Sequence, residues 1–248
     1  METHYSASFA TVRPMLHSWN LTPKEAVALQ RELADRVNYS TPLATCELVA
    51  GADCSYNRFS PWFYAAVVVL KASDGTIVDK AEAVGKSPFP YVPGLLTFRE
   101  APTILEAFSK LTHRPDVVLV DGQGRAHPRR IGVASHLGLW LGIPTIGCAK
   151  SKLIGDFKEP RKKAGSFSPL MIDEEQVGVV LRTKDGVKPL FISPGHGIDL
   201  ESSIRTVLSQ CRGYRQPEPT RLAHQVVNDL RRRMMGKHEK GGETEKTE

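Results

Sequence analysis

The 248-residue sequence predicts an α/β fold in which a mixed sheet, three antiparallel strands followed by parallel strands, is flanked by helices. Three observations predict this class. Apolar stretches of strand length come first, a Ser73-Asp74-Gly75 turn joins two of them into a hairpin, and later strands alternate with helical patterns. Such alternation is typical of parallel strands joined by crossover helices. Hydrophobic residues make up 41% of the chain, enough for a sizeable core.

The first half of the chain supplies the hairpin and two helices. Thr22 can cap a helix and Glu25 completes a capping box, so a helix begins there. Its apolar face contains Ala26, Leu29, Leu33 and Val37. Strands are expected at 48–56, 63–70 and 76–84. A proline-rich loop at 86–94 then leads into a helix at 97–111.

The second half predicts a strand at 116–121, a helix at 134–141 and a short buried strand at 144–148. A basic surface loop follows at 156–168. Strands at 177–182 and 189–193 flank a Lys184-Asp185-Gly186 turn, and helices follow at 200–211 and 219–233. This order is the ribonuclease-H-like topology. We expect an N-terminal extension at 1–20, one domain at 21–233 and a disordered charged tail at 234–248.

Two aspartates stand in strands, where aspartate is disfavoured. Asp53 lies inside the apolar stretch 48–56, and Asp121 closes the stretch 117–121. The predicted crossover brings these two strands together, so both carboxylates could hold one divalent metal ion. Each also has an ordinary interpretation, because aspartate often hydrogen-bonds a nearby turn.

Other candidates keep two interpretations each. Tyr91 lies in a loop that contains three prolines, which suits either a lid packed on the core or a rigid wedge for a base stack, and the residues alone slightly favour the lid. Glu100 either stabilises a helix start or is a third metal ligand. Lys150 is a surface lysine or a phosphate contact. The glycines at 122–124 form a turn or let the backbone approach a ligand closely. His196 lies in a glycine-rich turn that suits a phosphate contact.

Charge and cysteine content indicate which partners and which compartment to expect. The net charge is +6, with an isoelectric point of about 9.2, which favours polyanionic partners. The four cysteines form no C-x-x-C pair, so neither a zinc knuckle nor a redox motif is predicted. The sequence shows neither a signal peptide nor an apolar stretch long enough for a bilayer. We therefore expect a cytoplasmic protein with no membrane partner.

Six motifs, in this order along the chain, resemble those of the endonuclease V family. They are GADCSY at 51–56, PYVPGLLTFRE at 90–100, DGQGRAHPR at 121–129, ASHLG at 134–138, GCAKS at 147–151 and SPGHG at 193–197. The resemblance extends from about Leu21 to Arg233, the catalytic domain of such enzymes. The residues of the DGQG and AHPR segments resemble those of the bacterial branch, which acts on DNA, more than those of the eukaryotic branch, which favours RNA.

The resemblance implies a magnesium-dependent DNA-repair nuclease, with manganese as a substitute. Such an enzyme recognises deoxyinosine, which is deaminated deoxyadenosine, and cuts the second phosphodiester on its 3′ side. The implied partner is double- or single-stranded DNA containing deoxyinosine, possibly also RNA, and we expect a monomer. The alternatives are a ribonuclease for inosine-containing RNA and a reader that binds deaminated nucleic acid without cutting.

The resemblance also implies a role for particular residues. Asp53, Glu100 and Asp121 would hold the metal, and Lys150 and His224 would assist the chemistry. Tyr91 would be the wedge, and Gly94, Leu95 and Gly122 would form the pocket for the flipped base. The implied DNA contacts are Arg99, Arg125, His127, Arg129 and His196.

Overall fold

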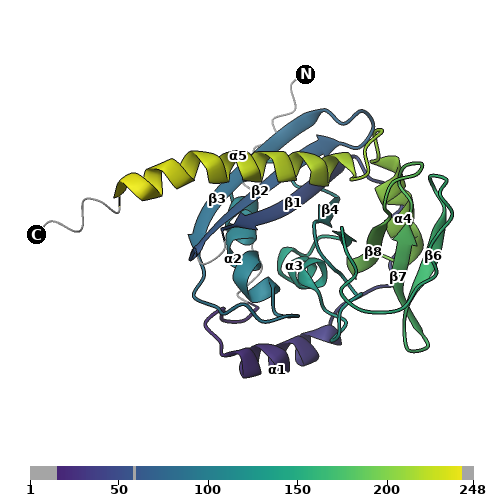
Figure 1. Ribbon diagram of the computed structural model, residues 1–248, viewed down its shortest axis with the longest axis horizontal. Helices are drawn as coiled ribbons and strands as arrows, with labels where there is room; N and C mark the ends of the chain where they lie inside the picture. The colour runs from purple at the N-terminus through teal and green to yellow at the C-terminus, as the bar shows by residue number, and fades with distance from the viewer. Residues whose placement is uncertain (1–15, 58–59, 242–248) are drawn as a thin grey trace, which may run out of the picture.

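The computed structural model describes residues 16–57 and 60–241, which form one eight-stranded sheet and five helices (Figure 1). The strand order is β3-β2-β1-β4-β5-β8-β7-β6. The strands are β1 (Leu48–Tyr56), β2 (Trp62–Lys71), β3 (Ile77–Lys86), β4 (Val117–Val120), β5 (Thr145–Ala149), β6 (Phe167–Ile172), β7 (Glu175–Leu181) and β8 (Leu190–His196). The first three are antiparallel and β1, β4 and β5 are parallel, as predicted.

The helices cover the two faces of this sheet. They are α1 (Pro23–Ala34), α2 (Thr97–Phe108), α3 (Val133–Leu141), α4 (Leu200–Ser209) and α5 (Glu218–Gly241). Helices α2 and α3 bury apolar side chains on one face, and α4 and α5 do so on the other. The long helix α5 crosses β1 and β2 and extends beyond β3 (Figure 1). The predicted capping box of α1 is present, with the Thr22 amide donating to the Glu25 carboxylate over 2.7 Å.

Period-two alternation along β1 decides which side chains face α5. Ala50 and Ala52 pack in the core beneath α2 and α3, whereas Val49 packs on the opposite face. Asp53 therefore points to the α5 face. The same alternation in β4 buries Val120 on the α2 and α3 side. Asp121, the next residue, then falls on the α5 side.

Helix α5 begins in direct backbone contact with β1. A Cβ atom built on Gly51 would lie 2.0 Å from the carbonyl oxygen of Pro219, which no real Cβ tolerates. Only glycine lets the start of α5 lie this close to the strand. Gly51 therefore sets how near α5 lies to the row of residues that includes Asp53.

Three features differ from the sequence-based expectations. Strand β6 falls where only a basic loop was expected up to residue 168, and it pairs with β7 as an edge strand. Helix α5 continues to Gly241 instead of ending near Arg233, because its last residues are mostly good helix formers. Leu16 and Trp19, from the expected N-terminal extension, pack against the core. The expected disorder at 242–248 and the extension at 1–15 lie outside the described residues.

Candidate active site

The two strand aspartates lie side by side, Asp53 within β1 and Asp121 directly after the adjacent parallel strand β4. β1 and β4 pair in register up to Ala52 and Val120, and the Asp121 amide donates to the Ala52 carbonyl over 3.2 Å. Because both side chains fall on the α5 face, their carboxylates share one small volume. The prediction that the crossover brings Asp53 and Asp121 together is confirmed.

Helix α5 adds an imidazole to the two carboxylates. Nδ1 of His224 lies 2.7 Å from Oδ2 of Asp53, and the amide of Asn228 lies 3.1 Å from Nε2 of His224. One ligand atom from each of Asp53, Asp121 and His224 lies within 4.8 Å of the others. A tautomer with its proton on Nδ1 satisfies both contacts of the ring, so Asn228 orients His224 toward Asp53.

Glu100 approaches the same group from the first turn of α2. Its side chain is only 8% exposed. Burial, together with the charges of Asp53 and Asp121, raises the pKa of Glu100 to about 8. Burial also raises the pKa of Asp121, and Asp53 adds to the effect. Glu100 does not belong to the three-residue donor group, although its charge is coupled to both aspartates.

A lysine and an arginine border the carboxylates on the β5 side. Lys150, directly after β5, forms an ion pair with Asp121, and its carbonyl accepts a hydrogen bond from Arg215 over 2.9 Å. Asp53 thus lies within β1, and Asp121 and Lys150 directly follow the neighbouring strands β4 and β5. The carboxyl ends of parallel strands are where α/β proteins bind ligands.

The donor set fits a divalent cation. Carboxylate oxygens held this close together repel one another, which adds to burial in raising the pKa values of Glu100 and Asp121. A cation would relieve that repulsion, and hard oxygen donors with one imidazole suit magnesium or manganese. The described residues therefore contain a candidate metal site at the ends of β1 and β4.

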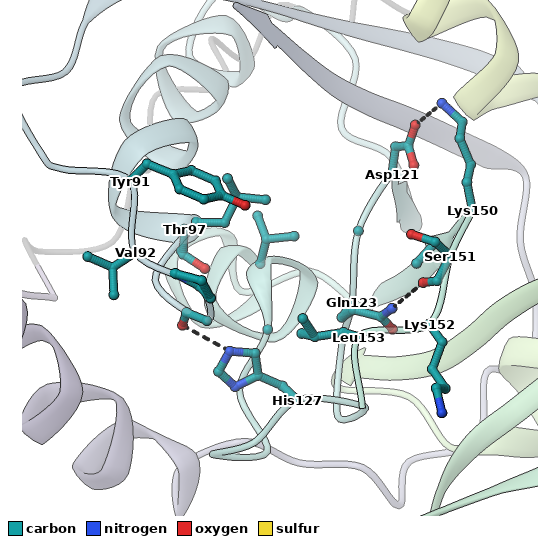
Figure 2. A pocket seen from close by; sticks show the side chains of 17 residues that line it. Tyr91, Val92, Thr97, Asp121, Gln123, His127, Lys150, Ser151, Lys152 and Leu153 are labelled. Atoms are coloured by element: carbon teal, nitrogen blue, oxygen red, sulfur yellow. Dashed lines mark hydrogen bonds and ion pairs between the residues drawn. The ribbon is translucent and has the colours of Figure 1, made fainter. Parts of the chain in front are cut away.

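A cavity of about 440 Å³ opens beside the carboxylates (Figure 2). This volume is in the range of about 300–1,000 Å³ that is usual for small-ligand pockets. Figure 2 shows Tyr91 and Thr97 on one side and Asp121 and Lys150 on the other. A group bound in the cavity would therefore lie next to the candidate metal site.

The proline-rich loop divides its side chains between core and solvent. Phe89 and Leu95 are buried and pack with Phe98 and Ala26. Tyr91 is 66% exposed, and the guanidinium of Arg99 lies 5.6 Å from its ring centroid. The loop is thus a lid anchored by Phe89 and Leu95, but Tyr91 is not part of the buried core.

Two of the three expected pocket residues line the cavity, and the third is buried in the core. Gly94 and Gly122 line the cavity, whereas the side chain of Leu95 points into the core. Three residues that follow Lys150 also line it, namely Ser151, Lys152 and Leu153. These three residues were not among the expected pocket residues, although the first of them belongs to the GCAKS motif. The buried side chain of Gln123 donates to the Ser151 carbonyl over 3.0 Å and ties this segment to the glycine loop.

Two expected DNA contacts hold the lid loop from inside the protein. Nε2 of His127 lies 3.0 Å from the carbonyl oxygen of Gly94, and Arg129 donates to the same oxygen over 2.8 Å. Arg129 also donates to Gln30 of α1. Burial lowers the pKa of His127 to about 4, and Arg129 adds to the effect, so the imidazole is neutral at pH 7. Their contacts orient the cavity wall.

Two further candidates also have partners within the protein. Arg125 forms an ion pair with Glu175 and lies over the ring of Tyr39. The guanidinium of Arg99 lies 5.1 Å from the ring centroids of Tyr56 and Phe63. These arrangements lock both arginines into the protein scaffold.

The SPGHG motif is not a glycine-rich turn, because residues 193–196 form the end of β8. The side chain of Ser193 and the backbone of β8 pack under the loop that contains the glycines at 122–124. The Gly124 amide donates to Ser193 Oγ over 2.9 Å. A Cβ on Gly124 would lie 2.1 Å from the Pro194 carbonyl oxygen, so this glycine permits contact with β8 and not with a ligand. His196 accepts a hydrogen bond from the Asn38 amide and does not line the cavity.

Comparisons with known proteins agree with this geometry. The family model for endonuclease V matches residues 31–225. An endonuclease V from Dehalococcoides mccartyi is 52% identical over 215 residues, which cover 87% of this chain and 96% of the relative. The chain belongs to the endonuclease V family. Like its relatives in this family, it is a nuclease.

Solved structures of the endonuclease V family share the fold. The crystal structure from Streptomyces avermitilis superposes with a TM-score of 0.84 at 42% identity, covering 88% of this chain and 96% of that one. A Ciona intestinalis endonuclease V is 26% identical, and its two complexes give TM-scores of 0.74 and 0.75, covering 85 to 86% of this chain and 98 to 100% of the other. That protein was solved with DNA containing an inosine followed by a ribo-adenosine.

Proposed function

We propose that this chain is a metal-dependent endonuclease of DNA repair. It recognises deoxyinosine and hydrolyses the second phosphodiester bond on the 3′ side of the lesion. The observation that carries the proposal is the group of Asp53, Asp121 and His224 at the ends of adjacent strands, beside a cavity of about 440 Å³. Family membership and the inosine-containing DNA bound by the Ciona relative support it.

The carboxylates prepare the site for a bound cation. Asp53 and Asp121, with His224 beside them and Glu100 behind, would hold magnesium or manganese, which supplies charge neutralisation for a phosphate and an activated water. His224 holds Asp53 in place through Nδ1, and Asn228 orients its ring from the other side. Lys150 brings a positive charge to the edge of the same site, where the nonbridging oxygens of a phosphate would lie.

The cavity suits a base that has left its stack. Gly94 and Gly122 place backbone at its wall, and amides there can donate to O6 of hypoxanthine, where adenine carries an amino group. Deoxyinosine pairs less well than deoxyadenosine, so flipping it out costs less. The exposed ring of Tyr91 stands at the cavity, where it can replace the flipped base in the duplex.

A nicking assay tests the proposal directly. With magnesium, the protein should nick a duplex at one position 3′ to a single deoxyinosine and leave the undamaged duplex intact. Asp121→Asn should abolish nicking and retain binding, because losing a negative charge does not repel phosphate. The control is Asp185→Asn, which removes an exposed carboxylate that accepts from the Ala164 amide. Near-normal nicking by Asp121→Asn would reject the carboxylate site, and binding without any nicking by the wild type would indicate a reader.

Inosine-containing RNA is the second candidate substrate. The ribo-adenosine that follows inosine in the Ciona complex favours testing it. The same assay, run on an RNA strand of identical sequence, compares kcat/KM for the two backbones. A preference for RNA would reassign the substrate without changing the site.

Metal identity is tested by replacing the ion. Magnesium and manganese should support nicking, calcium should support binding without turnover because of its looser coordination, and EDTA should stop the reaction. Full activity in EDTA would reject a metal-dependent mechanism. We also propose a cytoplasmic location, which the four unpaired cysteines support. Among the described residues, no helix has the length and apolar character needed to cross a membrane.

A further inference from the structure

A second exposed tyrosine lies in a loop that contacts the backbone of Lys150. Tyr214 is 53% exposed and lies in the short loop between α4 and α5. The guanidinium of Arg221 lies 4.4 Å from its ring centroid, and Arg221 is itself paired with Glu218. The rest of the ring faces solvent.

The loop that carries Tyr214 is held firmly. Its neighbour Arg215 donates to the carbonyls of Lys150, Lys188 and Pro189 over 2.8 to 2.9 Å. Thr183 donates to the Arg215 carbonyl, and the Glu218 amide donates to the Gln210 carbonyl over 2.9 Å. An exposed aromatic ring on a fixed loop loses little conformational entropy when it binds a partner.

Contacts on both sides connect this loop to the candidate active site. Arg215 bonds to the backbone of Lys150, which pairs with Asp121, and the charge of Asp121 counteracts the lowering of the Arg215 pKa. Arg221 precedes His224 by three residues on α5, so the two side chains are neighbours on the helix surface. The tyrosine ring therefore stands on a loop that contacts the backbone of Lys150, and it packs against an arginine of the helix that carries His224.

We propose that Tyr214, backed by Arg221, is a stacking platform for a base of the cleaved strand on the far side of the scissile phosphate. The inference rests on the proposed nuclease function. A strand that places a flipped base in the cavity and a phosphate at the carboxylates must continue past Lys150. Arg215 supplies positive charge there, complementary to its phosphates, whereas the charge of Arg221 is paired with Glu218. An aromatic ring accepts any base, because every base has a π face, so this platform reads no sequence.

Steady-state nicking of a deoxyinosine duplex tests the platform with Tyr214→Ala, Tyr214→Leu and Tyr214→Phe. Alanine and leucine should raise KM by about 5- to 100-fold, as expected for loss of one stacked base, and should change kcat by less than about twofold. Phenylalanine should behave as the wild type. The matched control is Phe167→Ala on the edge strand β6, which removes an aromatic ring that is also 53% exposed. Equal KM values for Tyr214→Ala and this control would overturn the proposal.

A second experiment identifies the nucleotide whose base stacks on Tyr214. Abasic residues replace, one at a time, the four nucleotides 3′ to the cleaved bond. One position should raise the wild-type KM by the same factor as Tyr214→Ala, and combining the two changes should add nothing further. Additive losses at every position would overturn the proposal. If the wild type does not cleave the intact duplex, the proposed function fails with it; if it cleaves but shows no coupling, only the platform fails.

Discussion

Tyr91 belongs to the lid loop but is mostly exposed, and Phe89 and Leu95 anchor the loop in the core. Truncating a buried aromatic residue costs about 3–5 kcal/mol. Because Tyr91 is 66% exposed, Tyr91→Ala should leave Tm almost unchanged. The same change at Phe89, which is buried, should lower Tm markedly and serves as the comparison.

The effect of Tyr91→Ala should appear on nucleic acid instead. Loss of one stacking partner should weaken binding to duplex deoxyinosine DNA by about 1–3 kcal/mol, with a smaller loss on single strands, where no partner base must be replaced. Tyr91→Phe should retain most binding. A large fall in Tm with equal losses on both substrates would place the ring in the fold and not in DNA binding.

At the scale of elements, the position of α5 decides whether His224 reaches Asp53. Gly51→Ala would put a methyl group 2.0 Å from the Pro219 carbonyl oxygen, so the start of α5 must move away from β1. We expect at least a tenfold fall in kcat, because the imidazole moves with the helix, together with a lower Tm.

Gly186→Ala is the control for Gly51→Ala. Gly186 has a φ of +70° and nothing within 4 Å of an added Cβ, so alanine there costs about 1–2 kcal/mol of backbone strain without touching the site. This variant should be less stable and nick normally. If both variants keep full activity, the contact between Gly51 and Pro219 does not position His224.

The elements that the sequence predicts well are those with a local signal. The strand at 48–56 and the capping box at Thr22 agree with the structure, because a short apolar stretch and a capping box are both defined by neighbouring residues. Strand β6 lacks such a signal: it contains Pro169 and follows a basic loop, and its place depends on pairing with β7. Local pattern also cannot show that residues 193–196 pack under the glycine loop as a strand.

The candidate site shows the same limit. Asp53 and Asp121 were predictable from the cost of aspartate in strands and from the crossover, which places their strands together. His224 lies on a distant helix whose contact with β1 depends on Gly51, and no local pattern connects them. The resemblance implied that Arg129 and His127 contact DNA, yet both bond to the Gly94 carbonyl, a contact that only the folded loop creates.

For the molecule as a whole, the distribution of cations predicts which of them contact DNA. Lys152 is exposed and lines the cavity, whereas the exposed Lys162 lies in the loop that leads to the far edge strand β6. Lys152→Ala should reduce the slope of log Kd against log salt by about one for duplex DNA. Lys162→Ala should leave the slope unchanged. Equal slopes for the two variants would contradict this assignment.

A buried histidine makes stability depend on pH. His136 is fully buried, 2.7 Å from the imidazole of His17, and burial, with His17 and His127 adding to it, lowers its pKa to about 3. The unfolded chain takes up a proton near the ordinary value of 6.5 and the folded chain does not. The free energy of unfolding should therefore fall as pH drops from 6.5 toward 3, by up to about 1.4 kcal/mol per pH unit.

Thermal melting in EDTA between pH 7.5 and 4.5 measures this slope. His136→Gln keeps a polar group at the position but cannot titrate, so its Tm should vary less with pH than that of the wild type, even if it is lower throughout. His113→Gln is the control, because His113 lies at the surface beside Asp79. A slope in His136→Gln as steep as in the wild type would mean that other groups cause the acid sensitivity.

The ribosome makes the residues of the candidate site at different times. Asp53 and Asp121 emerge early, but His224 and the helix that packs over them emerge only after β8 and α4 have been made. A nascent chain, or a fragment left by early termination, holds both carboxylates without the imidazole beside them. We expect such incomplete chains to be unable to cut DNA, so that cleavage begins only once translation has passed α5.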